Sequence, residues 1–260
     1  MSEAFFDGPS LKVKRANALL ENLYAVEQSF WLRCTPELNV DVDSETGNKI
    51  AVVRIREKPP ELIHVLAAEI IYHLRSTLDQ IAVALARMSK TVPNVKKIYF
   101  PTGDSLKGFL ASSEKNTAGI DSDLVELIIG EKPYDGGNDD LRSIFYLANI
   151  DKHLELIPAA HRGRVSGLSH FTFKNAITGI IIDDRLCPLD EGIVISELGP
   201  HGTITPNSSN AQIQVSGDIT FGNVSTFEGE PIFQKLYVLI DLVARLLQRF
   251  VKYCRNTGRI

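Results

Sequence analysis

The sequence predicts an α+β protein with a helical bundle core, a β-hairpin and a segregated antiparallel sheet. Two observations support this prediction. Apolar residues recur at helical spacing over several long segments, whereas residues 155–227 alternate apolar and polar residues between frequent Gly, Pro, Asn and Ser. Helices and strands therefore fall in separate runs, which argues against a doubly wound fold. We expect one domain over 1–260, with its helical core at 11–33, 60–152 and 231–255, its hairpin at 37–56 and its β region at 155–227.

The composition is ordinary for a globular protein. The 260 residues suffice for a sizeable core, and a hydrophobic fraction of 44% with a charged fraction of 23% argues against disorder. The net charge of −4 supplies no general attraction for nucleic acid. Cys34, Cys187 and Cys254 are far apart and form no CxxC spacing. We expect them to be reduced thiols of a cytoplasmic protein.

No segment has the pattern of a membrane span or a signal peptide. The first residues lack a cationic region followed by an apolar run. The apolar stretch from Leu236 to Leu247 is short and carries Asp241 and Arg245. We therefore expect a cytoplasmic protein with no membrane partner.

The first part of the chain predicts a helix followed by a hairpin. Pro9 and Ser10 precede a helix over 11–33, whose apolar side is formed by Leu19, Leu20, Leu23, Val26, Phe30 and Trp31. Residues 37–56 alternate apolar and polar residues on both sides of a turn sequence at 44–48. This alternation indicates two antiparallel strands.

The segment from about 60 to 89 predicts the central helix. Pro59 and Pro60 suit the first helical positions, because amides there have no intrahelical partner. One arc of the helical wheel collects the apolar residues Leu62, Leu66, Ile70, Leu74, Leu78, Ile81 and Leu85. So broad an arc is typical of a helix at the centre of a bundle.

Shorter elements follow a loop over 90–103. Helices are predicted at 105–112, 121–130 and 139–152. Short strands are predicted at 170–173, 179–182, 192–195, 211–215 and 218–221, and a final helix at 231–255. The four long helical segments could form a four-helix bundle. The apolar residues of the first and last helices could alternatively form a homodimer interface.

The first candidate site lies on the central helix. Arg75 and Asp79 are four residues apart and share a face with Tyr72, at the border of the apolar arc. One interpretation is an intrahelical ion pair with no further role. The other is an arginine that a carboxylate positions to bind an anion.

The second candidate lies at the end of the 139–152 helix, in the sequence from Asn149 to His153. Asp151 and His153 could form a carboxylate-oriented imidazole suited to proton transfer. Alternatively, Lys152 and His153 are simply cations that favour a helix C-terminus.

Common catalytic signatures are missing from the sequence. There is no HExxH, GxGxxG, GxxxxGK[ST] or GxSxG sequence, so neither a metal nor a cofactor is expected. Arg245, Arg249 and Lys252 share one face of the last helix, with Arg255 and Arg259 beyond. This row is either a solvated face or a strip that binds the phosphates of RNA or DNA.

Four segments together resemble a widespread family of uncharacterised bacterial proteins. They are Tyr72-His-Leu-Arg-Ser-Thr-Leu-Asp79, Phe100-Pro101, Pro133-Tyr134-Asp-Gly-Gly137 and Asn149-Ile-Asp-Lys-His153. The resemblance covers roughly residues 60–157 and implies no activity. Gln80 stands where a second histidine would be expected after Asp79.

The chain is also similar, more loosely, to HEPN-type helical bundles, many of which are ribonucleases of toxin or defence systems. Their motif is an arginine followed four to six residues later by a histidine on a helix. The match here, Arg164 to His170, lies in the β region. The resemblance therefore implies helical topology, and a catalytic site would need Arg75 and His153 from different helices.

Two functions follow from these residues. The favoured one is a non-catalytic binding protein whose polar pocket accepts a small anionic ligand or a partner segment. This pocket would comprise Tyr72, Arg75, Asp79, Tyr134, Asp151 and His153, with Asn149 as a further ligand-binding residue. The alternative is a metal-independent ribonuclease or phosphodiesterase, in which His153 is the acid/base and Arg75 stabilises the phosphate.

Overall fold

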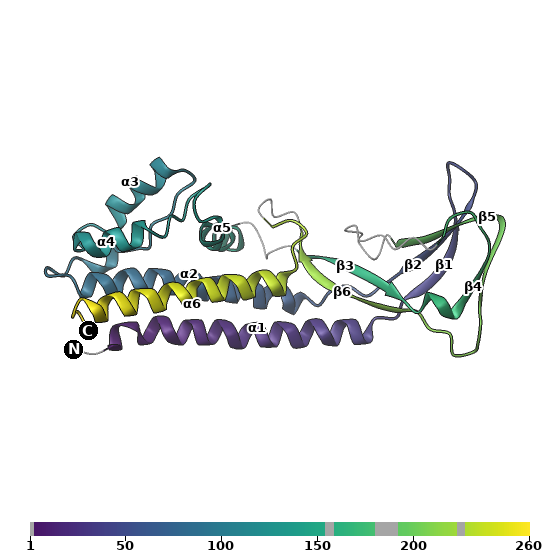
Figure 1. Ribbon diagram of the computed structural model, residues 1–260, viewed down its shortest axis with the longest axis horizontal. Helices are drawn as coiled ribbons and strands as arrows, with labels where there is room; N and C mark the ends of the chain where they lie inside the picture. The colour runs from purple at the N-terminus through teal and green to yellow at the C-terminus, as the bar shows by residue number, and fades with distance from the viewer. Residues whose placement is uncertain (1–2, 154–158, 180–191, 223–226) are drawn as a thin grey trace. The chain divides into compact units, whose positions relative to one another are not determined.

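The computed structural model describes residues 3–153, 159–179, 192–222 and 227–260 (Figure 1). These residues form six α-helices and six β-strands, which confirms the predicted α+β class. They divide into two units. The helical unit comprises 1–23, 64–157 and 233–260, and the β unit comprises 24–63 and 158–232.

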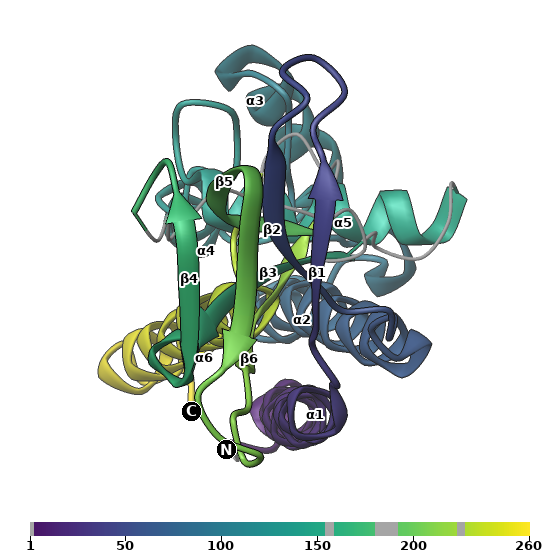
Figure 2. The ribbon, with the colours of Figure 1, turned by 90° about the vertical axis from the view of Figure 1, so that its right-hand side faces the viewer.

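The helical unit contains three long helices that run alongside one another. They are the first part of α1 (Asp7–Arg33), α2 (Glu61–Arg87) and α6 (Ile232–Asn256). α5 (Asp139–His153) crosses them, since it is seen end-on in Figure 1 and lengthwise in Figure 2. The fourth long helix thus does not run parallel to the others, as a four-helix bundle would require. Among the described helices, none is long and apolar enough to cross a bilayer.

α2 supplies much of the core of the helical unit. Its buried apolar residues extend along the helix and include Leu66, Ile70, Ile71, Leu74, Leu78, Ile81 and Leu85. Leu62, which the helical wheel placed in the apolar arc, is instead 50% exposed. The Pro60 carbonyl accepts the Ile63 amide, so the proline begins the first turn without an unpaired N–H of its own.

α6 has one apolar side and one charged side. The buried residues are Ile232, Leu236, Leu239, Ile240, Val243, Leu246, Leu247, Phe250 and Cys254. Arg245, Arg249 and Lys252 lie on the exposed side, at spacings of three and four residues that return to the same face. The strong amphipathic pattern is the reason why the predicted and observed helix ends agree within one residue.

Side-chain hydrogen bonds cap the starts of two helices of the helical unit. The Ser105 hydroxyl accepts the Gly108 amide at the start of α3 (Leu106–Asn116). Asn138 Oδ1 accepts the Leu141 amide at the start of α5. α4 (Ser122–Ile129) lies between them in the chain, and α3 ends beyond the predicted position 112.

The β unit contains two antiparallel sheets. The first has the order β1-β2-β5-β4, formed by β1 (Glu37–Val42), β2 (Lys49–Arg54), β5 (Ile193–Pro206) and β4 (Phe171–Ala176). The second pairs β3 (Ala159–Ser166) with β6 (Gln214–Phe221). β1 and β2 form the predicted hairpin, with Leu38 opposite Val53.

Sequence patterning was less accurate over the rest of the β unit. The strand β3 was not predicted, because Gly163 and the charged residues beside it hide the alternation. Two strands were predicted at 211–215 and 218–221, but the structure has the single strand β6, which begins at Gln214 and leaves 211–213 outside it. β5 continues well past the predicted end at 195. The predicted strand at 179–182 lies almost entirely outside the described residues.

The second half of α1, which belongs to the β unit, buries a charged residue. Glu27 is only 4% exposed, whereas Val26, predicted on the apolar side, is half-buried. Glu27 Oε1 accepts the Ile219 amide of β6 at 2.7 Å. Burial raises the pKa of Glu27, the Ile219 hydrogen bond opposes the rise, and Asp218 adds to it.

Candidate functional site

Arg75 and Asp79 lie together on α2, as the sequence predicted. The Arg75 Nε atom is 3.5 Å from Asp79 Oδ2, and the guanidinium carbon is 4.4 Å from the centroid of the Phe145 ring of α5. Less than a third of either charged side chain is exposed. The arginine is thus held between a carboxylate and an aromatic face, which stabilises a partly desolvated cation.

Asp79 also fastens the segment that follows α2. Its Oδ1 atom accepts the Phe100 amide at 3.0 Å. Burial raises the pKa of Asp79, and the Phe100 amide and Arg75 oppose that rise. The Phe100 ring is buried and stacks on Phe145. Both charged residues therefore have a structural role in joining α2, α5 and the segment around Phe100.

The substitution Asp79→Asn separates the hydrogen bond from the charge. The new side chain would still accept the Phe100 amide through its Oδ1 atom, but it would no longer neutralise Arg75. We expect Asp79→Asn to lower the free energy of unfolding by about 1 kcal/mol or less, because relief of the buried carboxylate offsets part of the lost ion pair. Urea unfolding followed by circular dichroism measures this change. A loss of roughly 3 kcal/mol or more would mean that the ion pair itself stabilises the fold.

The two tyrosines of the predicted pocket make their contacts away from the ion pair. Tyr72 is 61% exposed, and Lys12 Nζ of α1 lies 5.5 Å from the centroid of its ring. Tyr134 packs against Phe109 of α3, with ring centroids 5.3 Å apart. Both rings therefore have neighbours that sequence spacing did not indicate.

The remaining predicted residues lie near the end of α5. Asn149 is exposed. The side chains of Asp151 and His153 fall outside the described part of the structure, as does the side chain of Arg164. The ribonuclease hypothesis, which pairs Arg75 with His153, stays a prediction.

Two of the three cations in the predicted row on α6 form ion pairs. Arg245 lies 2.7 Å from Asp241, and Arg249 lies 2.6 Å from Glu131. The two arginine side chains are nevertheless 65% and 58% exposed. The Arg245 pair is exposed on both sides and therefore weak, so an anionic ligand can compete for that guanidinium. Arg249 stays paired with the buried Glu131 but keeps part of its guanidinium exposed.

The cations line a cleft of about 970 Å³ in the helical unit. Its α6 wall is formed by Leu242, Arg245, Gln248, Arg249 and Lys252. Its second wall consists of the α4–α5 connection and the first two residues of α5, and it is formed by Gly130, Glu131, Lys132, Gly137, Asn138, Asp139 and Asp140. The sequence analysis found the cationic row but not the cleft, because no local pattern shows which loop lies beside a helix face.

Glu131 is the buried member of this cleft. Its side chain is 7% exposed and is held by Arg249. Burial raises the pKa of Glu131, and the charge and hydrogen bond of Arg249 oppose the rise. Glu131 therefore anchors one arginine at the base of the α6 row.

The two acidic residues at the start of α5 already have hydrogen-bond partners, one from α6 and one from their own wall. Asp140 accepts a hydrogen bond from Lys235 Nζ at 2.9 Å, and Asp139 Oδ1 accepts the Gly136 amide at 3.0 Å. These contacts reduce the repulsion that free carboxylates would exert on an anion. The α6 wall thus presents most of the cations of the cleft, and Lys132 adds one from the second wall.

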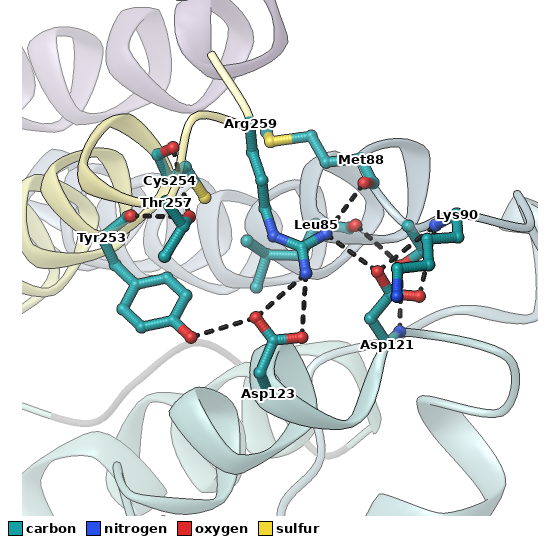
Figure 3. A network of polar contacts seen from close by, with 10 residues as sticks. Leu85, Met88, Lys90, Asp121, Asp123, Tyr253, Cys254, Thr257 and Arg259 are labelled. Atoms are coloured by element: carbon teal, nitrogen blue, oxygen red, sulfur yellow. Dashed lines mark hydrogen bonds and ion pairs between the residues drawn. The ribbon is translucent and has the colours of Figure 1, made fainter.

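Arg259, the last cation predicted in the row, belongs to a different network (Figure 3). It donates to Asp121 Oδ2 at 2.8 Å, to both oxygens of Asp123 at 2.9 Å and to the Met88 carbonyl at 3.1 Å. The Tyr253 hydroxyl donates to Asp123 Oδ2 at 3.0 Å. Arg259 is only 17% exposed, so this network fastens the end of the chain to α4 rather than forming a ligand site.

Metal and thiol chemistry have little support in the described residues. They contain no group of three or more His, Cys, Asp or Glu side chains placed to hold a metal ion. Burial raises the pKa of Cys34 and of Cys254 to about 11, so both thiols are weak nucleophiles at neutral pH. Cys187 lies outside the described residues.

No protein-family model, no curated protein and no solved structure matches this chain. The resemblance to a bacterial family therefore stays a prediction. The chemistry of the cleft is derived from its own residues.

Proposed function

We propose that this protein is a non-catalytic binding protein that takes a small phosphate-bearing ligand in the cleft between α6 and the α4–α5 connection. The observation that carries the proposal is the row of Arg245, Arg249 and Lys252 along that cleft, with both arginines more than half exposed. Guanidinium groups bind phosphate oxygens in pairs, and a lysine adds a compact positive charge.

The dimensions of the cleft suit a small molecule. Ligand pockets commonly enclose about 300–1,000 Å³, and a volume of about 970 Å³ lies within this range. Gln248 stands between the cations and adds an amide that can both donate and accept. Leu242 adds an apolar surface for the uncharged part of the ligand.

The residues along the cleft favour binding over catalysis. Neither histidine nor cysteine is among the residues that line it. Its most buried carboxylate, Glu131, is occupied by Arg249. General acid–base catalysis needs a group that is positioned to exchange a proton with the substrate. The proposal therefore assigns the cleft no reaction.

Titration with pyrophosphate tests the proposal. We expect isothermal titration calorimetry of the unmodified protein to detect binding that weakens as salt is added. The double substitution Arg245→Gln and Lys252→Gln should weaken binding about tenfold or more, because each lost charged contact is worth roughly 1.5–3 kcal/mol. Arg249 is left in place because it neutralises the buried Glu131.

A matched control comes from the same unit. Arg15→Gln removes an exposed arginine of α1, which lies 4.0 Å from Glu69 and does not line the cleft. This variant should bind pyrophosphate as the unmodified protein does. Equal weakening in both variants would indicate general charge attraction and contradict the proposed site. Tighter binding of single-stranded RNA, lost in the double variant, would instead favour a nucleic-acid surface.

A further inference from the structure

β1 is an edge strand whose outer side pairs with no other described strand. The direction of its backbone groups follows from the hairpin turn. The Asp43 amide donates to the Asn48 carbonyl, so these two residues form a hydrogen-bonded pair. In an antiparallel ladder such pairs alternate with pairs that are not hydrogen-bonded. The backbone groups of Leu38, Val40 and Val42 therefore point away from β2, toward the open side.

The two edges of this sheet differ in how they are protected. Along β4, Lys174 is followed by Asn175 in a left-handed conformation with φ 53°, and the register shifts between Lys174 and Ala176. A charge and an irregularity of this kind keep an edge from pairing further. β1 has a regular register with β2 and exposes Val40 at 45% and Val42 at 65%. Glu37 and Asp41 lie on the opposite face of β1, and an edge that is regular and apolar on one face is suited to pairing.

We propose that β1 pairs with β1 of a second copy of this chain, antiparallel about a two-fold axis at Val40. Val40 then lies opposite Val40 of the second copy, and Leu38 lies opposite Val42. Each of these pairs exchanges two backbone hydrogen bonds through the groups that point outward. The apolar side chains of the two strands meet on one face of a sheet that continues from one copy into the other.

The polar contact made by Asp41 favours this register over the neighbouring ones. With Val40 at the axis, Asp41 lies opposite Asn39 of the second copy, and the amide can donate to the carboxylate. A shift by two residues one way sets Asp41 against Asp41, and a shift the other way sets it against Glu37. At the ends of the chosen register Glu37 meets Asp43. Arg56 lies 2.9 Å from Glu37 and Arg54 pairs with Asp41, so these ion pairs moderate repulsion in every register, and the Asn39 amide opposite Asp41 is what distinguishes the chosen one. The Asp43 carboxylate accepts the Glu45 and Thr46 amides.

A groove beside the start of β1 extends the contact. It encloses about 800 Å³, and no charged residue lines it. Leu32, one of the residues that line it, is 86% exposed. With Val40 at the axis, position 44 of the second copy lies opposite Pro36, another residue of this groove. The hairpin turn of the second copy therefore runs into the groove, which enlarges a ladder that is short compared with a standard interface of about 1,600 Å².

Disulfide crosslinking at the two-fold axis tests the register. Val40→Cys is made in full-length protein carrying Cys34→Ser, Cys187→Ser and Cys254→Ala. Opposite residues of a hydrogen-bonded pair have Cα atoms about 5.5 Å apart, within disulfide range. Two Val42→Cys residues would be separated by about 13 Å along the strands and should not react. We expect oxidation to link Val40→Cys chains about tenfold or more faster than Val42→Cys chains.

Two further measurements test the proposed dimer without relying on the relative crosslinking rates at positions 40 and 42. A mixture of Leu38→Cys and Val42→Cys proteins should form a crosslinked heterodimer. Analytical ultracentrifugation should find the unmodified protein dimeric at micromolar concentration and Val40→Lys monomeric, with circular dichroism unchanged because an edge strand tolerates lysine. A monomeric unmodified protein, or equal crosslinking at positions 40 and 42, would overturn the proposal.

Discussion

Replacing Arg259 by leucine is expected to lower the melting temperature by about 5 °C. Arg259 makes charge-assisted hydrogen bonds with two carboxylates and one backbone carbonyl, and the side chain is 17% exposed. Leucine fills part of the space but leaves Asp121 and Asp123 without their cation. The substitution should therefore loosen the end of α6 from α4, and differential scanning calorimetry measures the change.

The loss caused by Arg259→Leu should depend on pH. Hydrogen bonding to Arg259 holds the pKa of Asp121 below its usual range. Burial tends to raise the pKa of Asp123, but hydrogen bonds from Tyr253 and Arg259 lower it on balance. A lowered folded-state pKa stabilises the protein above the ordinary aspartate value of about 3.9, and that stabilisation is lost as the pH falls through the lowered value. The difference between the two proteins should be full at about pH 5–7 and shrink below about pH 4.

Arg15→Leu is the matched control for Arg259→Leu. Arg15 belongs to the same unit, but its side chain is 55% exposed and its ion pair spans 4.0 Å. Such pairs contribute little, so the melting temperature should hardly move. If both substitutions had the same effect, the network of Figure 3 would have no special stabilising role.

Replacing Glu27 by alanine is expected to lower the free energy of unfolding by about 2 kcal/mol. Glu27 is buried in the β unit, and its carboxylate accepts the Ile219 amide of β6. Alanine would leave that amide without an acceptor in a site closed to water. An unpaired buried donor is costly, and the removed side chain also leaves a void. Urea unfolding followed by circular dichroism reports the loss.

Glutamine at position 27 should have the opposite effect at neutral pH. It keeps an oxygen for the Ile219 amide but carries no charge, so the burial of a carboxylate no longer opposes folding. The raised pKa of Glu27 means that this residue favours folding most when protonated, below the ordinary glutamate value of about 4.3. That contribution is lost as the pH rises through the raised value. Glu27→Gln should thus be more stable than the unmodified protein at about pH 7 and equal to it near pH 4.

The two substitutions at position 27 control each other. A stability gap between Glu27→Gln and the unmodified protein that did not change with pH would mean that the carboxylate is not desolvated. Equal destabilisation by alanine and glutamine would mean that the negative charge, rather than the shape or the hydrogen bond to Ile219, is what position 27 supplies.

Strong local periodicity made several elements predictable. The helical spacing of Leu236, Val243, Leu246 and Phe250 requires one apolar side whatever lies against it, and α6 has that side. The hairpin was equally predictable, because two segments of alternating apolar and polar residues joined by a short turn sequence pair with each other. β3 and β6 were harder, because glycine and charged residues interrupt the alternation in these two strands.

The candidate site was predictable only in part. The sequence showed that Arg75 and Asp79 share a face, and that Arg245, Arg249 and Lys252 share another. It could not show that the first pair is enclosed by Phe145 and Phe100, or that the second set lines a cleft. A helical wheel shows which residues share a face of one helix. It does not show how exposed they are, because exposure depends on which other segments pack against that face.

The sequence by itself determined the fold class, the apolar sides of the long helices and the hairpin, because each depends on residues near one another in the chain. The tertiary structure alone decided which charges are buried and which remain available. Glu131 meets Arg249 across 118 positions, and Glu27 meets Ile219 across 192. Contacts at such separations depend on how the whole chain packs, and no local pattern encodes them.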